Sequence, residues 1–178
     1  MDIIKLKDKN FKKYISAEEI DMAISKVAQQ INEEYKDDIP IFIITLNGAI
    51  IFAADLFKRL TITCSLTCVK FSSYEGTQTT NDIQSLIGLK EDLRGKRVII
   101  VEDIVDTGNT YEHLMEILKD KGTKDIKIAT MTFKPDAYKK SFPVHYVGLT
   151  IPPKFVVGRG LDYDGLGRNL NDIYQVCE

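Results

Sequence analysis

The sequence has 178 residues, of which 44% are hydrophobic and 28% are charged, and this length and composition are typical of one globular domain. The formal net charge of -2 gives no general attraction for nucleic acid or for an anionic membrane, and no apolar stretch approaches the roughly 20 residues of a membrane-spanning helix. We therefore expect a cytoplasmic protein with one domain over residues 1–178 that binds neither nucleic acid nor membrane.

The first third of the chain predicts a helix and then a strand followed by a second helix. Ser16 and Glu19 have the spacing of a capping box, and the isoleucine and valine residues after them recur at intervals of three and four, which predicts a helix over 17–35. The apolar, β-branched run 39–46 predicts a buried strand. An Asn-Gly pair interrupts that run before helical spacing resumes over 50–60.

The middle of the chain predicts two more strands and another helix. Residues 66–71 form the first strand, and the polar stretch 72–82 has no apolar periodicity, which predicts a long loop. A strand at 98–101 precedes an acidic, glycine-containing turn, and a helix then follows that carries Tyr111, Leu114, Ile117 and Leu118 and ends at Gly122.

Two more apolar strands, 126–131 and 146–149, complete the repeating pattern. Strands that are apolar throughout are typical of a parallel sheet covered on both faces, so the predicted fold class is α/β, with a parallel sheet flanked by helices. The tail from Phe155 onward contains four glycines and no regular periodicity. We expect it to form a small hood over one edge of the sheet.

The strongest functional signal lies between the strand at 98–101 and the helix that follows it. Residues 102–110 read Glu-Asp-Ile-Val-Asp-Thr-Gly-Asn-Thr, at the end of a strand where open α/β sheets place their ligand crevice. The backbone N–H groups, the glycine and the hydroxyls of Thr107 and Thr110 suit a phosphate monoester at a helix N-terminus.

The three carboxylates beside this phosphate cradle need partners of their own, because they would repel a bare phosphate. Ribose hydroxyls or a Mg²⁺ ion would supply such partners, so a sugar phosphate fits the segment. The alternative is a purely structural turn, in which Asp106 or Asn109 caps the helix while Glu102 and Asp103 are solvated.

Two adjacent acids, two aliphatic residues and Asp-Thr-Gly-x-Thr after an aliphatic strand resemble the phosphoribosyl pyrophosphate (PRPP) motif of type I phosphoribosyltransferases. The similarity is nearest to the hypoxanthine (guanine) phosphoribosyltransferases. It extends over most of the chain, through matching segments at 46–48, 71–74, 134–135, 153–158 and 161–163 and through Arg168.

This resemblance implies the type I phosphoribosyltransferase core, with a hood made largely of residues 150–178 and the N-terminal segment. It also implies a purine salvage enzyme that transfers 5-phosphoribose from PRPP to hypoxanthine and guanine, forming IMP or GMP and pyrophosphate with Mg²⁺. Relatives pair as homodimers or homotetramers, so the resemblance implies a homo-oligomer.

On the sugar side of the site, the resemblance implies that Glu102 and Asp103 hold the ribose hydroxyls and Mg²⁺, and that residues 106–110 surround the 5′-phosphate. Asp106 is also the implied general base. A free aspartate is ionised at neutral pH and can accept the N7 proton as the purine attacks C1′. The implied PRPP-binding set is Glu102, Asp103, Asp106, Thr107, Gly108, Asn109 and Thr110.

On the pyrophosphate side, the resemblance implies that the backbone of Leu46, Asn47 and Gly48 holds pyrophosphate, often through a cis peptide, which here would be Leu46-Asn47. An ordinary Asn-Gly turn is the alternative, and the sequence does not decide between them. Arg168 would hold a pair of pyrophosphate oxygens with its planar fork of donors, or it is a surface charge. Asp162 would help to hold Mg²⁺ through water, or it is a turn residue.

Ser73 and Tyr74 are the implied pair that closes a flexible loop over the reacting centre and excludes water. Exclusion of water favours transfer over hydrolysis at C1′. The alternative is an ordinary mobile surface loop over 72–82.

On the purine side, Lys134 is the implied specificity residue. An ammonium only donates, so it can bond O6 of hypoxanthine or guanine but opposes the 6-amino group of adenine. Phe155 would stack on the purine, and the backbones of Val156 and Asp162 would face its edge. The alternatives are a solvated lysine and a phenylalanine in the core.

Four residues depart from the family pattern: Asn47 and Asn109 stand where basic residues are frequent, Glu75 follows the loop tyrosine where glycine is common, and Arg159 replaces a frequent aromatic residue. They leave the affinity and the preferred purine open. Two other functions also stay open: a regulator that senses PRPP, and a phosphoribosyltransferase for another base such as xanthine. Lys134 and Phe155 favour a 6-oxopurine over adenine or orotate.

Overall fold

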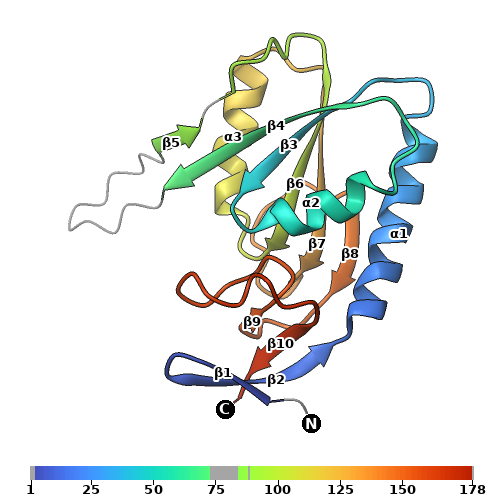
Figure 1. The fold of residues 1–178 in the computed structure, drawn as a ribbon. Coiled ribbons are helices and arrows are strands. Elements are labelled where there is room, and N and C mark those ends of the chain that lie inside the picture. Colours follow the sequence, from blue (N-terminus) through green and yellow to red (C-terminus); the bar gives the residue numbers. More distant parts are fainter. Residues whose placement is uncertain (1–2, 73–83, 88, 178) are drawn as a thin grey trace.

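The main sheet carries the predicted parallel strands. The structure is a computed structural model that describes residues 3–72, 84–87 and 89–177. Within these residues the sheet order is β5-β4-β3-β6-β7-β8, with β5 antiparallel and the other strands parallel (Figure 1). The strands are β3 (Ile41–Leu46), β4 (Ser65–Ser72), β5 (Gln84–Ile87), β6 (Arg97–Val105), β7 (Asp125–Phe133) and β8 (Tyr146–Thr150).

Helices cover both faces of this sheet. Helices α1 (Ala17–Glu34) and α2 (Ala49–Phe57) pack on one face and share one hydrophobic cluster with β3, β6 and β7. Helix α3 (Asn109–Asp120) packs on the opposite face in a second cluster. The predicted capping box begins α1, because the Glu19 backbone N–H donates to Ser16 Oγ at 3.2 Å and the Ser16 N–H donates back to the Glu19 carboxylate at 2.9 Å.

A second, antiparallel sheet forms the hood from both ends of the described chain. Its order is β1-β2-β10-β9, and Phe11, Val157 and Tyr174 are the buried centre of its own cluster. Strands β6, β7 and β8 point toward this sheet (Figure 1), so the hood faces the edge where ligands bind in parallel sheets. Its strands are β1 (Ile3–Leu6), β2 (Lys9–Ile15), β9 (Val156–Val157) and β10 (Ile173–Val176). The predicted fold class is confirmed.

The structure corrects several predicted element boundaries. Strand β6 continues to Val105, so Glu102 and Asp103 lie in the strand and not in the turn after it. The pairing of β6 with β7 extends to Val105 and Phe133 and sustains this longer strand. Strands β1, β2 and β5 were not predicted, and neither were β9 and β10 in the tail that was expected to be irregular. Most of the predicted loop 72–82 lies outside the described residues. No helix in the described part of the chain is long and apolar enough to cross a membrane.

Candidate active site

Two adjacent carboxylates lie at the carboxyl end of β6. Glu102 is buried, and burial together with the charge of Asp103 raises the pKa of Glu102 well above its usual value. Burial also raises the pKa of Asp103, although the Ile104 N–H, 2.9 Å from Asp103 Oδ1, and the charge of Arg168 oppose the rise. A buried acid and a half-buried neighbour are therefore available to partners that donate hydrogen bonds or carry positive charge.

The turn after β6 leads directly into the N-terminus of α3. Gly108 is the N-cap of this helix and has a φ of 85°, a left-handed conformation that favours glycine. A Cβ at this position would lie 2.7 Å from the ring of Tyr138 and 2.8 Å from Lys140 Cγ. The Lys139 N–H donates to the carbonyl of Thr107 at 3.3 Å and holds the turn from outside. The turn thus directs backbone N–H groups of a helix N-terminus toward the site.

The predicted base and the predicted specificity lysine form an ion pair. Lys134 Nζ donates to Asp106 Oδ2 at 3.0 Å, with the lysine side chain 10% exposed and the aspartate side chain 46% exposed. The two residues directly follow Val105 and Phe133, which are paired across β6 and β7. The register of two neighbouring parallel strands therefore brings the two side chains together at one edge of the sheet.

The loop between β3 and α2 contributes backbone to the same edge. The Leu46–Asn47 peptide is cis, the arrangement that the sequence left undecided. A Cβ at Gly48 would lie 1.8 Å from Asp103 Oδ2, so only glycine lets this loop approach the carboxylate so closely. This contact places the predicted pyrophosphate loop beside the predicted ribose-binding acids.

The C-terminal tail supplies a second ion pair near these acids. Arg168 and Asp162 are 2.8 Å apart, and Arg168 Nη1 also donates to the Gly160 carbonyl at 2.7 Å. The charges of both residues act on the pKa of Asp103, which Arg168 lowers and Asp162 raises. The tail therefore brings its predicted magnesium and pyrophosphate residues close to β6.

Phe155 does not belong to the buried core, so the alternative of a phenylalanine in the core does not hold. Its side chain is 46% exposed, and its ring centroid lies 5.9 Å from that of Tyr163, with the two rings nearly perpendicular. Phe11 lies 6.3 Å away, and Lys9 Nζ is 5.9 Å from the Phe155 ring. The Phe155 ring is exposed and packs near Phe11 and Tyr163, so it offers a face on which a planar base can stack. The adjacent Val156 is buried and paired with Gln175 in the hood sheet.

Some predicted site residues fall outside what the structure describes. Ser73 and Tyr74 lie outside the described residues, and so their predicted role in a closing loop stays a prediction. Asn47 and Asn109 are exposed at the β3–α2 loop and at the start of α3, respectively. Thr110 is described only by its position in the first turn of α3.

Sequence reasoning missed two features of this region. The ion pair of Asp106 with Lys134 follows from the positions of both residues just after neighbouring parallel strands, so strand register was the signal that could have found it. Arg159 was considered only as a departure from the family pattern, but it is 9% exposed and pairs with Asp21 and Asp55. No sequence pattern marked that contact, because it joins distant segments.

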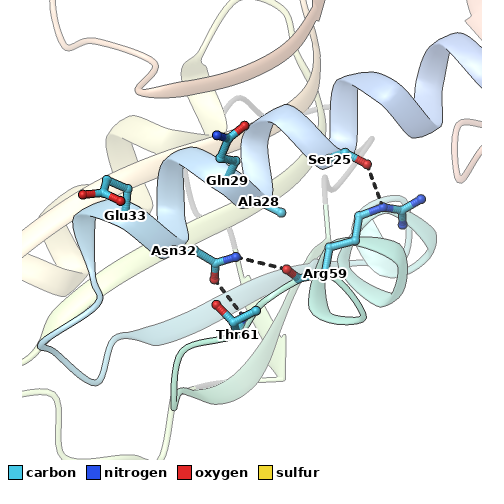
Figure 2. Close-up of a pocket in the computed structure, with 7 residues that line it drawn as sticks. All are labelled: Ser25, Ala28, Gln29, Asn32, Glu33, Arg59 and Thr61. Carbon is cyan, nitrogen blue, oxygen red and sulfur yellow. Dashed lines mark hydrogen bonds between the residues drawn. The ribbon is translucent and has the colours of Figure 1, made fainter.

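A separate hollow lies between α1 and the segment that follows α2 (Figure 2). Its lining residues come from α1 and from the segment that follows α2 (Figure 2). None of the predicted site residues lines it. The lining residues are Ser25, Ala28, Gln29, Asn32, Glu33, Arg59 and Thr61.

Comparison with known proteins gives consistent matches. The family model of the phosphoribosyl transferase domain matches residues 12–164. The chain is 39% identical over 161 residues to the hypoxanthine phosphoribosyltransferase of Escherichia coli K12, covering 89% of this chain and 90% of that protein. It is 38% identical over 157 residues to the hypoxanthine-guanine phosphoribosyltransferase of Staphylococcus epidermidis, covering 88% of each.

A solved structure shows the same similarity in three dimensions. The crystal structure of a hypoxanthine-guanine phosphoribosyltransferase from Bacillus anthracis, with a HEPES molecule in its active site, superposes with a TM-score of 0.87 at 32% identity. The superposition covers 93% of this chain and 98% of the other.

Proposed function

The chain belongs to the hypoxanthine (guanine) phosphoribosyltransferases of the type I family, and from this premise we propose how its own residues carry out the reaction. It is a purine salvage enzyme that transfers 5-phosphoribose from PRPP to hypoxanthine or guanine. A bond forms between a purine nitrogen and C1′, the bond from C1′ to the pyrophosphate oxygen breaks, and IMP or GMP and pyrophosphate leave. The purine gives up one proton in this exchange.

The ion pair of Asp106 with Lys134 is the observation that carries the purine assignment. In a 6-oxopurine, O6 and N7 lie side by side on one edge of the base. A carboxylate and an ammonium 3.0 Å apart match this edge, since Asp106 accepts the N7 proton while Lys134 donates to O6. In adenine the 6-amino group would face the ammonium, two donors would oppose each other, and the base would be rejected.

The buried acids and the α3 turn account for recognition of the sugar phosphate. Glu102 and Asp103 accept hydrogen bonds from the ribose 2′- and 3′-hydroxyls, which offset the cost of placing a buried and a half-buried carboxylate side by side. The N–H groups of residues 106–110 bind the 5′-phosphate at the N-terminus of α3, with Gly108 allowing close approach. Leu46, Asn47 and Gly48 bind pyrophosphate through their backbone, and Arg168 binds it through its guanidinium.

A Mg²⁺ ion fits the charges that surround Asp103. Burial raises the pKa values of both Glu102 and Asp103; the charge of Asp103 adds to the rise for Glu102, and the charge of Asp162 adds to the rise for Asp103. Within the described residues, no three acidic, histidine or cysteine side chains converge on one point. Because Glu102, Asp103 and Asp162 do not form a complete metal site by themselves, they would hold Mg²⁺ together with water and the oxygens of PRPP, and the ion would neutralise charge on the departing pyrophosphate.

The hood positions the base and limits access of water. Phe155 stacks on the purine from the hood side, and the backbones of Val156 and Asp162 face the edge that distinguishes hypoxanthine from guanine. Ser73 and Tyr74 close over C1′ during transfer and keep water from capturing the sugar. The whole chain acts as one phosphoribosyltransferase domain in the cytoplasm, as a homodimer or homotetramer.

The test is an assay of the purified protein with PRPP, Mg²⁺ and each of hypoxanthine, guanine, xanthine and adenine. We expect rapid formation of IMP and GMP, and adenine should react slowest. A preference for adenine would contradict the role of the ion pair, and efficient use of xanthine would extend the range of substrates beyond hypoxanthine and guanine.

A further inference from the structure

Arg159 is the only side chain on a tight backbone turn in the hood. Gly158, Arg159 and Gly160 have φ values of 104°, 51° and 104°, in the left-handed range that residues other than glycine rarely adopt. A Cβ at Gly158 would lie 2.1 Å from the Asp172 carbonyl oxygen. The glycines thus pack by backbone alone, and the arginine side chain is the group through which this turn can be anchored.

The Arg159 side chain joins the hood to both helices on one face of the sheet. Its Nη2 lies 2.5 Å from Asp21 Oδ1 on α1 and 2.9 Å from Asp55 Oδ2 on α2, and the side chain is only 10% exposed. A guanidinium this well shielded from solvent interacts strongly with the carboxylates that it contacts. The turn is therefore tied to two rigid helices.

Arg59 contacts the same carboxylate of α1, Asp21, that Arg159 contacts. It follows α2, and its Nη2 lies 3.3 Å from Asp21 Oδ1. Figure 2 shows the Arg59 side chain extending toward α1, where Nε donates to Ser25 Oγ at 3.1 Å. Asp21 is therefore held between two arginines, so the anchor of Arg159 on α1 is itself fixed.

The anchored turn leads directly to the pyrophosphate side of the site. A Cβ at Gly160 would lie 2.1 Å from the Gly48 carbonyl oxygen, so the hood turn rests on the β3–α2 loop. The Gly160 N–H donates to the Arg168 carbonyl at 2.9 Å, and Arg168 Nη1 donates to the Gly160 carbonyl at 2.7 Å. A displacement of residue 159 would reach both Gly48 and Arg168 through these contacts.

We propose that Arg159 is a positioning residue that sets the place of Arg168 and of the β3–α2 loop for binding of the pyrophosphate group of PRPP. The proposal rests on the proposed function, because it takes those two elements as the pyrophosphate site. Arg159 touches no substrate and acts through Gly160. Its loss should therefore weaken recognition of PRPP more than recognition of the purine, which Lys134 and Phe155 bind.

The test compares Arg159→Met with Arg97→Met. Arg97 also pairs with several carboxylates, Glu34, Asp38 and Asp125, and its side chain is 19% exposed, but it begins β6 at the end of the strand opposite the site. Both changes remove a shielded charge of the same kind. Steady-state kinetics of both variants would be measured for PRPP and for hypoxanthine, together with the melting temperature.

For Arg159→Met we expect the KM for PRPP to rise about tenfold, with the KM for hypoxanthine within about twofold of the wild type, because small misplacements of binding groups are costly. Arg97→Met should lower the melting temperature and leave both KM values unchanged. Arg159→Lys, whose ammonium lacks the planar fork, should fall between Arg159→Met and the wild type. Equal changes in both KM values, or a loss of stability with no change in the KM for PRPP, would overturn the proposal.

Hydrogen exchange separates this proposal from the proposed function. Arg159→Met should speed amide exchange in residues 158–170 about fivefold or more, while exchange in residues 97–105 stays as in the wild type. If the wild type transfers no phosphoribose, the proposed function fails, and exchange still decides whether Arg159 fixes the turn. Unchanged exchange in 158–170 would refute the positioning role whatever the activity.

Discussion

Replacement of Lys134 by methionine should relax the choice between hypoxanthine and adenine. Methionine keeps most of the apolar stem of this buried side chain but has no donor for O6. It also leaves Asp106 without its ion-pair partner 3.0 Å away. We expect a large loss of hypoxanthine transfer and a much smaller loss of adenine transfer, because the ammonium opposes the 6-amino group in the wild type.

The magnitude follows from the burial of the two partners. A hydrogen bond from a charged donor contributes about 1.5–3 kcal/mol, which corresponds to a loss of about 10- to 150-fold in kcat/KM for hypoxanthine. Asp106 is 46% exposed, so the loss of its ion pair should reduce the free energy of unfolding by no more than about 1 kcal/mol. Any effect of a less well oriented Asp106 falls on both bases and cancels in the ratio of their kcat/KM values.

The assay measures kcat/KM for hypoxanthine and adenine in the wild type, in Lys134→Met and in Lys127→Met. Lys127 lies near the start of β7, whereas Lys134 follows the end of this strand, and Lys127 also forms an ion pair, with Glu34. Lys127→Met should keep the wild-type ratio, and Lys134→Met should lower it at least about tenfold. If Lys134→Met lowered kcat/KM for hypoxanthine and adenine by the same factor, the proposed hydrogen bond from Lys134 to O6 would be wrong.

Three other changes test separate parts of the site. Asp106→Asn should keep the fold, as judged by circular dichroism, and lower kcat by about 10²- to 10⁴-fold because the proton acceptor is lost; full turnover would remove its role as base. Phe155→Leu should raise the KM for hypoxanthine about tenfold, because stacking on the purine is lost. Leu166→Ala, at an equally exposed position, should leave this KM unchanged. Equal KM values for the two variants would argue against the stacking role of Phe155. Glu102→Gln should raise the melting temperature of the unliganded protein, and the gain should grow from pH 5 to pH 8. Burial raises the folded-state pKa of Glu102, so the stability linked to its protonation is complete below the unfolded-state pKa and is lost as the pH rises. Glutamine does not titrate, and so the variant does not lose this stability. A gain that shrank with pH would contradict a raised pKa.

Much of the fold was predictable because periodicity and burial agree in this sequence. The isoleucine and valine stripe of α1 is buried as its spacing requires, and the apolar strands lie in a parallel sheet between two layers of helices. The ends of β6 were less predictable, since Glu102 and Asp103 are polar residues in a strand. Their pairing with β7 overrides the local preference of acidic residues for turns, and no single-sequence pattern reports such pairing.

The members of the site were easier to predict than their partners. The 102–110 segment was predicted from motif and chemistry, and Lys134 was implied by the family resemblance. The structure places Asp106 and Lys134 in contact at one edge of the sheet. The contacts of Arg159 with Asp21 and Asp55 join segments more than 100 residues apart in the chain. Such contacts depend on how the hood sits on the helices, which the pattern of one sequence does not encode. The exposure of Phe155 was likewise open, because the same residue type fits a core and a stacking surface.

The most direct test of the central claim is calorimetric titration of the intact protein with PRPP and with IMP in the presence of Mg²⁺. The adjacent acids Glu102 and Asp103 of β6 and the N-terminus of α3 predict saturable binding of both, since both carry a ribose diol and a 5′-phosphate. If neither molecule bound, the sugar phosphate site at the end of β6 would be refuted, and the proposed mechanism with it.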